Sequence, residues 1–246
     1  IVLAEVGAAA VLSGVTVRTV DDENAIMQPE DVRALVRGKN QHFPDTGLIC
    51  METATCLGTV YPLPVMAEIY GLAKAHGIPV HLDGARIFNA AAALGVDAVE
   101  IARYTDSVQM CLSKGLCAPV GSVLAGSAEF IEKAHRNRKM LGGGLRQAGY
   151  LAAAGIIALE KMTGRLQEDH DNLKRLAEGL SEIKGIQVNM RQTEINMVFA
   201  DIEGTGLEQQ YIIDKLLEKG IKANDGREGN HIRFVTNHGV SSKDIE

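Results

Sequence analysis

Short apolar runs alternate with longer amphipathic segments along most of this 246-residue chain. The runs 48–51, 78–82 and 107–112 have the length and composition of buried strands, whereas the segment 62–76 repeats its apolar side chains with the period of a helix. This alternation predicts an α/β fold with a mostly parallel sheet between layers of helices. Further strand signals lie at 15–20, 121–125, 186–190, 195–202 and 232–235, and further helix signals begin near 29, 87, 128 and 207.

The character of the pattern changes near residue 165. A triglycine at 142–144 precedes a nearly apolar segment, 145–162, which predicts a helix that is buried in the protein or covered by another subunit. A charged amphipathic segment at 164–183 then leads into strand and helix signals typical of a smaller α+β unit. We therefore expect a large domain over residues 1–165 and a small C-terminal domain over residues 166–246.

Two residues of opposite charge directly follow buried strand signals. Asp83 ends the run 78–82, and Lys114 lies in the tight-turn sequence Ser113-Lys114-Gly115 after the run 107–112. Ligands of open α/β sheets collect at the carboxyl ends of the strands. An amine that can bond to an aldehyde and a carboxylate that can keep a pyridine nitrogen protonated are the pair that pyridoxal phosphate (PLP) chemistry requires. Each residue also has an ordinary explanation, because Asp83 could cap the next helix and Lys114 could be a surface lysine.

Three long blocks of the sequence carry a family resemblance. They are HLDGARIFNAA at 81–91, SVQMCLSKGLCAPVGSVLAG at 107–126 and RKMLGGGLRQAGYLAAAGIIAL at 138–159. These blocks resemble the low-specificity threonine aldolases of the β-eliminating lyase family, which are fold-type I PLP enzymes. The resemblance implies a fold-type I PLP-dependent transferase-like large domain. It also implies a cytoplasmic homo-oligomer, a dimer or a tetramer, that cleaves L-threonine or L-allo-threonine to glycine and acetaldehyde.

The resemblance also implies roles for four residues. Lys114 would bond covalently to PLP, and Asp83 would hold the pyridine nitrogen of the cofactor protonated. Arg86 would contact the phenolic oxygen of PLP and the substrate carboxylate, and Arg233 would be the second carboxylate-binding arginine. A planar guanidinium suits bidentate binding of a carboxylate. The alternatives are a surface ion pair for Arg86 and an exposed strand position for Arg233, whose side chain should point away from those of its two apolar neighbours.

Two departures from the family pattern concern proton transfer. Where the family usually has Glu-Asn-Thr-His, this chain has Glu52-Thr53-Ala54-Thr55, and a hydroxyl cannot replace an imidazole as a base near neutral pH. The sequence also starts at Ile1, so we expect the phosphate-binding loop and the stacking imidazole of the family to lie ahead of it. Two other classes therefore stay open: another PLP-dependent β-eliminating lyase acting on an amino acid, and an inactive truncated homologue that keeps the fold.

Charge and composition argue against several other classes of protein. A net charge of −6 gives no electrostatic reason to expect a nucleic acid or an anionic membrane as partner, and no apolar run reaches the roughly 18 residues of a membrane span. The cysteines and histidines lack metal-ligand spacing, so we expect no catalytic metal. We expect buried, reduced thiols, as in a cytosolic protein, and a His81 that either bonds the Asp83 carboxylate or is structural. The histidines expected to be solvated are His42, His76, His135 and His170.

Overall fold

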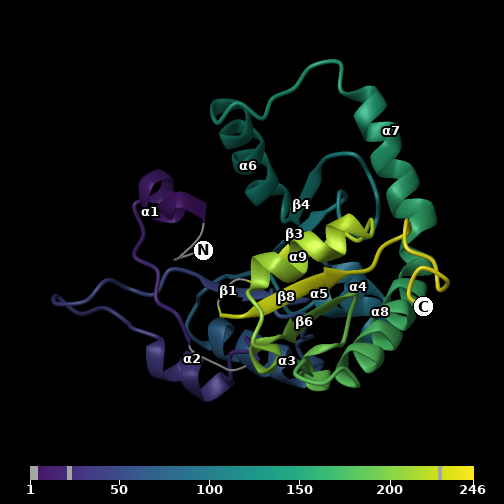
Figure 1. The fold of residues 1–246 in the computed structure, drawn as a ribbon. Helices are drawn as coiled ribbons and strands as arrows, with labels where there is room; N and C mark the ends of the chain where they lie inside the picture. Colours follow the sequence, from purple (N-terminus) through teal and green to yellow (C-terminus); the bar gives the residue numbers. More distant parts are fainter. Residues whose placement is uncertain (1–4, 21–23, 227–228) are drawn as a thin grey trace.

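In the computed structural model, residues 5–20, 24–226 and 229–246 are described, and within these ranges the strands form two four-stranded sheets (Figure 1). The strands are β1 (Ile49–Glu52), β2 (Val80–Asp83), β3 (Ser107–Cys111), β4 (Ser122–Gly126), β5 (Gln187–Val188), β6 (Met197–Asp201), β7 (Asn224–Asp225) and β8 (His231–Val235). The helices are α1 (Ala8–Ser13), α2 (Pro29–Leu35), α3 (Leu63–Ala75), α4 (Ile87–Leu94), α5 (Ala98–Ala102), α6 (Ala128–Met140), α7 (Gly149–Ile157), α8 (Leu166–Ser181) and α9 (Gln209–Glu218).

The first sheet has the order β1-β2-β3-β4, in which β1, β2 and β3 are parallel and β4 is antiparallel to β3. Leu82 pairs with Met51 on one side and with Val108 on the other, so these three buried side chains share one face of the sheet. Apolar side chains of α3, α4 and α5 pack in the same core as this face. The mostly parallel α/β arrangement predicted from the alternating pattern is therefore confirmed.

The opposite face of the first sheet is polar. Asp83 pairs with Glu52 and Gln109, and His81 pairs with Cys50 and Ser107. Cys50 and Asp83 on this face are exposed, whereas their neighbours along the same strands are buried in the core. The strands are thus two-sided: one side stabilises the fold, and the other presents functional groups.

The second sheet has the order β5-β6-β8-β7 and is antiparallel throughout the described residues. Buried residues of α8 pack against Val198 and Phe234 on one face of this sheet. Met197 and Val235, on the other face, pack with the core of the first sheet. The small α+β unit is confirmed, and its sheet turns one face toward the first sheet. The boundary between two domains at residue 165 stays a prediction.

The predicted helix over 145–162 differs from the observed structure. The helix α7 begins only at Gly149, because Gly142 and Gln147 adopt left-handed backbone angles with φ of 88° and 52°. After Ile157 the chain continues through a π-helical turn and a 3₁₀ turn directly into α8, so that α7 and α8 follow each other along one side of the molecule (Figure 1). The apolar side chains of α7 are largely exposed in this chain, and Tyr150 retains 76% of its accessible surface.

The strand predicted at 15–20 is wrong. Residues 14–20, all of which are described, lie outside any helix or strand, and Val15 and Val17 are exposed. Alternation of apolar and polar residues produces a stable strand only where a neighbouring strand can pair with it. This segment instead links α1 to the residues ahead of α2 and pairs with neither sheet.

Candidate functional site

Lys114 lies in a tight turn that follows β3. The amide of Cys117 donates a hydrogen bond to the Lys114 carbonyl (2.9 Å), and the amide of Ala118 donates to the Leu112 carbonyl (2.9 Å). Gly115 allows the turn to pack closely against its surroundings, because a Cβ atom there would lie 2.9 Å from Leu166 Cδ2. The turn is therefore fixed by its backbone, while the Lys114 side chain stays exposed.

Asp83 is the last residue of β2 and its side chain accepts a hydrogen bond from the Ala85 amide (3.0 Å). The next residue, Gly84, donates from its amide to the Gln109 carbonyl (2.7 Å), and a Cβ atom at Gly84 would lie 2.9 Å from that oxygen. Asp83 thus forms a local turn ahead of α4 rather than capping the helix, whose N-terminal boundary residue is Arg86. One carboxylate oxygen is held by the turn, which fixes the direction of the side chain.

A cavity of about 350 Å³ brings Arg86 and Lys114 together with the end of β8. Neither Asp83 nor Arg233 lines this cavity. Asn196 and Asn237 also line the cavity, and neither was predicted from the sequence. No local signal marks residues that reach a site only when β6 and β8 pack against the first sheet. The lining residues are Arg86, Ser113, Lys114, Gly115, Cys117, Asn196, Val235 and Asn237.

The two predicted carboxylate-binding arginines interact electrostatically. Arg233 pairs with Phe199 in the second sheet. Its side chain lies on the face that turns toward the first sheet, opposite the side chains of its two neighbours in β8, as predicted. Burial lowers the pKa of Arg86, and the positive charge of Arg233 lowers it further, against the opposing effect of nearby acids that include Glu52 and Asp83. The Arg233 Nε is buried without a hydrogen-bond acceptor among the described residues. Two cationic groups and one unsatisfied donor therefore favour a bound anion here.

His81 shares the polar face of β2 with Asp83. Its Nδ1 lies 2.8 Å from the Ser107 Oγ, which accounts for one of its ring nitrogens. Burial lowers the pKa of His81, while the negative charge of Asp83 acts in the opposite direction. The structure thus gives His81 a hydrogen-bonding partner in β3 and places it within the electrostatic influence of Asp83.

Thr55 occupies the position at which the family usually has a histidine. Its side chain is fully buried, and its Oγ1 lies 2.6 Å from the Thr59 Oγ1. The Thr59 hydroxyl in turn donates to the Asn24 carbonyl (2.6 Å). The Thr55 hydroxyl is therefore held inside the protein, and Thr55 does not line the cavity.

Two predictions about burial are wrong. His170 was expected to be solvated but is only 7% exposed, because the face of α8 that carries His170 packs against α4.

The cysteines are free thiols, but none of the four is buried; Cys50 and Cys117 are exposed, and the other two are partly exposed. Cys50 and Cys111 do lie in strands, on the polar face that carries His81. The local sequence does not show which face of a helix is covered by another helix, or which face of a sheet stays open to solvent.

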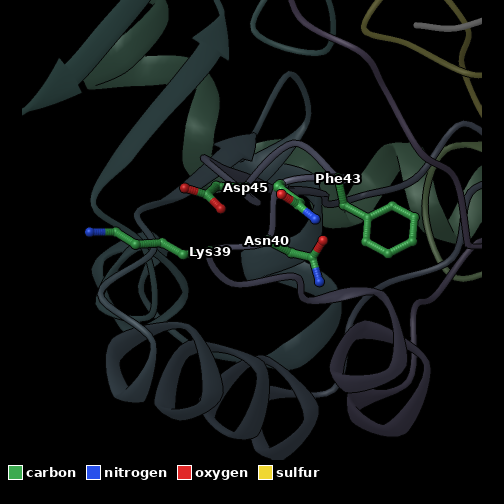
Figure 2. Close-up of a pocket in the computed structure, with 5 residues that line it drawn as sticks. Lys39, Asn40, Phe43 and Asp45 are labelled. Atoms are coloured by element: carbon green, nitrogen blue, oxygen red, sulfur yellow. The ribbon is translucent and has the colours of Figure 1, made fainter.

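A second hollow, of about 510 Å³, lies on the loop between α2 and β1. Figure 2 shows Lys39 and Phe43 extending in opposite directions from this loop, without converging on a common point. All five lining side chains are exposed, and none belongs to the residues implicated in chemistry: Lys39, Asn40, Gln41, Phe43 and Asp45. We therefore take the cavity at Lys114 as the candidate active site. Across the described ranges, no group of three or more His, Cys, Asp or Glu side chains has the arrangement of a metal site.

Comparison with known proteins defines the class. Residues 1–203 match the family model of the beta-eliminating lyases, and the chain belongs to this family. It is 42% identical over 247 residues to low-specificity L-threonine aldolase 1 of Arabidopsis thaliana, covering 98% of this chain and 69% of that protein. It is 44% identical over 201 residues to the low specificity L-threonine aldolase of Escherichia coli K12, covering 81% of this chain and 59% of that protein.

Solved structures show the same fold. A putative L-allo-threonine aldolase from Listeria monocytogenes superposes with a TM-score of 0.81 at 22% identity, covering 98% of this chain and 67% of that one. The threonine aldolase of Leishmania major superposes with a TM-score of 0.78 at 18% identity, covering 99% of this chain and 71% of that one. The arrangement of the sheets is thus that of the fold-type I enzymes of this family.

Proposed function

We propose that the protein is a PLP-dependent lyase that cleaves L-threonine and L-allo-threonine to glycine and acetaldehyde. The observation that carries the proposal is the cavity in which Arg86 lies with the exposed amine of Lys114, together with the pair of cationic groups that Arg86 and Arg233 form. An amino acid carries both a carboxylate, which is the anion that the two arginines favour, and an amino group. The threonine aldolase of Arabidopsis thaliana named above matches 98% of the chain, which includes all these residues.

The residues present fit PLP. Lys114 would hold the aldehyde carbon of the cofactor, and Asp83, on the open polar face of β2, would hold its pyridine nitrogen. When bound, PLP accepts the electron pair that remains on Cα after the Cα–Cβ bond breaks. Asp83 would keep the nitrogen protonated by hydrogen bonding and charge, and the turn at Gly84 keeps the Asp83 carboxylate in place.

Arg86 and Arg233 orient the substrate through its carboxylate. The repulsion between the two guanidinium groups and the cost of burying the Arg86 charge, which both lower the pKa of Arg86, would be offset by a bound anion. The buried Nε of Arg233 is a donor ready for one carboxylate oxygen. Thr55 takes no part in proton transfer, because its hydroxyl is engaged with Thr59 inside the core.

Product analysis tests the proposed reaction. The purified protein is incubated with PLP and L-threonine, and glycine, acetaldehyde, 2-oxobutyrate and ammonia are measured. Retro-aldol cleavage gives equal amounts of glycine and acetaldehyde. Formation of 2-oxobutyrate and ammonia would instead identify a β-eliminating activity, and no product together with no change in the cofactor spectrum would reject an enzymatic role.

Arg233→Ala should raise the KM for L-threonine by about 10- to 100-fold while changing kcat much less. The reason is that the carboxylate is bound in both the ground state and the transition state, so its loss weakens uniform binding. Steady-state kinetics with L-threonine measure the effect. Arg175→Ala, which removes an exposed arginine of α8, is the matched control and should leave KM unchanged. An unaltered KM in Arg233→Ala would place Arg233 outside the substrate site.

We further propose that the protein forms dimers or tetramers. The exposed apolar side chains of α7, of the segment before it and of the end of α6 exceed what a monomer usually leaves in contact with water; they include Met140, Leu141, Leu145, Tyr150, Ile156 and Ile157. Light scattering after size exclusion should give a dimer or tetramer, and replacing Ile156 and Ile157 together by glutamate should shift the protein to smaller species. A monomer at micromolar concentration would contradict this proposal.

We also propose a cytoplasmic location, supported by the four free thiols, which the reducing cytosol keeps unpaired. In the part of the chain that is described, none of the helices has the length and apolar character needed to span a bilayer.

A further inference from the structure

A chain of buried polar side chains connects the two sheets behind the candidate active site. The Asn89 side-chain amide, on α4, donates one hydrogen bond to His170 Nε2 on α8 (3.1 Å) and one to Asn196 Oδ1 (3.3 Å). The Asn196 amide donates to the Thr236 carbonyl (2.7 Å), and the Thr236 hydroxyl donates to the Asp169 carbonyl (2.6 Å). Each of these five residues is less than a tenth exposed.

The direction of each hydrogen bond in this network is fixed by chemistry. An amide nitrogen only donates, so His170 Nε2 must be the unprotonated, accepting nitrogen of the ring. Burial lowers the pKa of His170, which agrees with a neutral ring, although the negative charges of Asp169 and Asp171 act in the opposite direction. Asn89 therefore uses its amide to join α8 to the segment that enters β6.

The network touches the active site at two places. At the first, a Cβ atom on Gly115 would lie 3.2 Å from the Asn89 Oδ1, so Asn89 packs directly against the turn that carries Lys114. At the second, Thr236 follows β8 immediately, and its amide donates to the Asn196 carbonyl (3.1 Å). Asn196 itself lines the cavity with Arg86 and Lys114. The strand that carries Arg233 is thus tied to the lysine turn through Asn89 and Asn196.

We propose that Asn89 is a positioning residue for the substrate: it fixes β8, and with it Arg233, relative to Arg86 and Lys114. This inference rests on the proposed function. Binding of a carboxylate by two guanidinium groups depends on their separation, and a displacement of about 1 Å is enough to weaken such a contact severely. Apolar packing between α4 and α8 allows small sliding movements, whereas directional hydrogen bonds between buried groups do not. Asn89 therefore determines how well the site binds an amino acid, without touching it.

Asn89→Asp tests this role with almost no change in volume. The substitution replaces the donating amide nitrogen by an accepting oxygen, which cannot donate to Asn196 Oδ1 and can pair with His170 only if the ring donates from Nε2. The dissociation constant for glycine, measured by titration of the bound-cofactor spectrum, should rise about tenfold, and the KM for L-threonine should rise in parallel. The cofactor band and kcat should change less than about threefold, because neither Lys114 nor Asp83 is altered.

A pair of substitutions at His170 serves as a second test in case Asn89→Asp folds poorly. His170→Gln keeps a neutral acceptor for the Asn89 amide and should retain glycine binding close to that of the unmodified protein. His170→Leu removes the acceptor and should weaken glycine binding about as much as Asn89→Asp. Leu173→Ala is the control for stability alone, because Leu173 is buried one turn along α8 against the second sheet and outside the network. It should lower the melting temperature and leave the glycine dissociation constant unchanged.

A double-mutant cycle decides whether Asn89 acts through Arg233. On an Arg233→Ala background, Asn89→Asp should have little additional effect on glycine binding, since the group it positions is gone. The same fold-change in both backgrounds, or an equal loss of glycine binding in Leu173→Ala, would overturn the inference and leave Asn89 a structural residue. An unmodified protein that gives neither a cofactor band nor a spectral response to glycine would overturn the proposed function, and the inference with it.

Discussion

Replacing Lys114 by alanine should remove the visible absorbance band of the lysine-bound cofactor and lower the rate of glycine release by on the order of 10⁴-fold or more. Lys114 is the amine that lines the cavity beside Arg86, and it sits in a turn whose backbone hydrogen bonds do not involve its side chain. The variant should therefore fold normally. The absorbance spectrum of the protein with PLP and the rate of acetaldehyde formation measure the two effects.

The control for this prediction is Lys174→Ala, which removes an exposed lysine of α8 that does not line the cavity. Spectrum and turnover should both survive in that variant. If Lys114→Ala kept the band or a normal rate, Lys114 would not be the residue that holds the cofactor, and the assignment of the site to this cavity would fail.

Asp83→Asn should leave PLP bound but lower kcat by two or more orders of magnitude. A neutral amide cannot stabilise a protonated pyridine nitrogen, so the electron pair released from Cα is accepted less readily. The substitution isolates this effect, because the side-chain oxygen of the introduced asparagine can still accept the hydrogen bond from the Ala85 amide that shapes the turn. Single-turnover kinetics with L-threonine separate the chemical step from substrate binding.

Asp97→Asn is the matched control for this second prediction. Asp97 is exposed and precedes α5 without making a side-chain capping bond, so the loss of its charge should have little effect. Asp83→Glu keeps the charge at a longer reach and should recover part of the lost rate. A normal rate in Asp83→Asn would remove Asp83 from the catalytic role.

The sequence alone predicted those parts of the fold that depend on local chemistry. The runs that became β2 and β3 are short, apolar and bounded by turn residues, so both the strands and the positions of Asp83 and Lys114 at their ends followed from the pattern. The start of α2 at Pro29 and the end of α3 before Gly77 were predicted for the same reason, since proline and glycine act through their own backbone preferences.

What the sequence did not predict depends on which surfaces meet. His170 and the segment 15–20 were both assigned from local patterns that were correct in themselves. Whether a helix face is solvated is decided by the neighbouring helix, and whether an alternating segment forms a strand is decided by the presence of a partner strand. Asn196 and Asn237 reach the cavity only because the second sheet packs against the first.

The two-sided strands of the first sheet also bear on how such a protein changes over evolutionary time. Leu82 and Val108 hold the sheet against its helices from one side, whereas Asp83 and Gln109 project from the other. A substitution on the polar side alters reactivity with little cost to folding, and one on the apolar side does the reverse. The same scaffold can therefore acquire a different reaction by changes to a few side chains on the polar face. The fold itself is maintained by buried residues that do not contact the substrate.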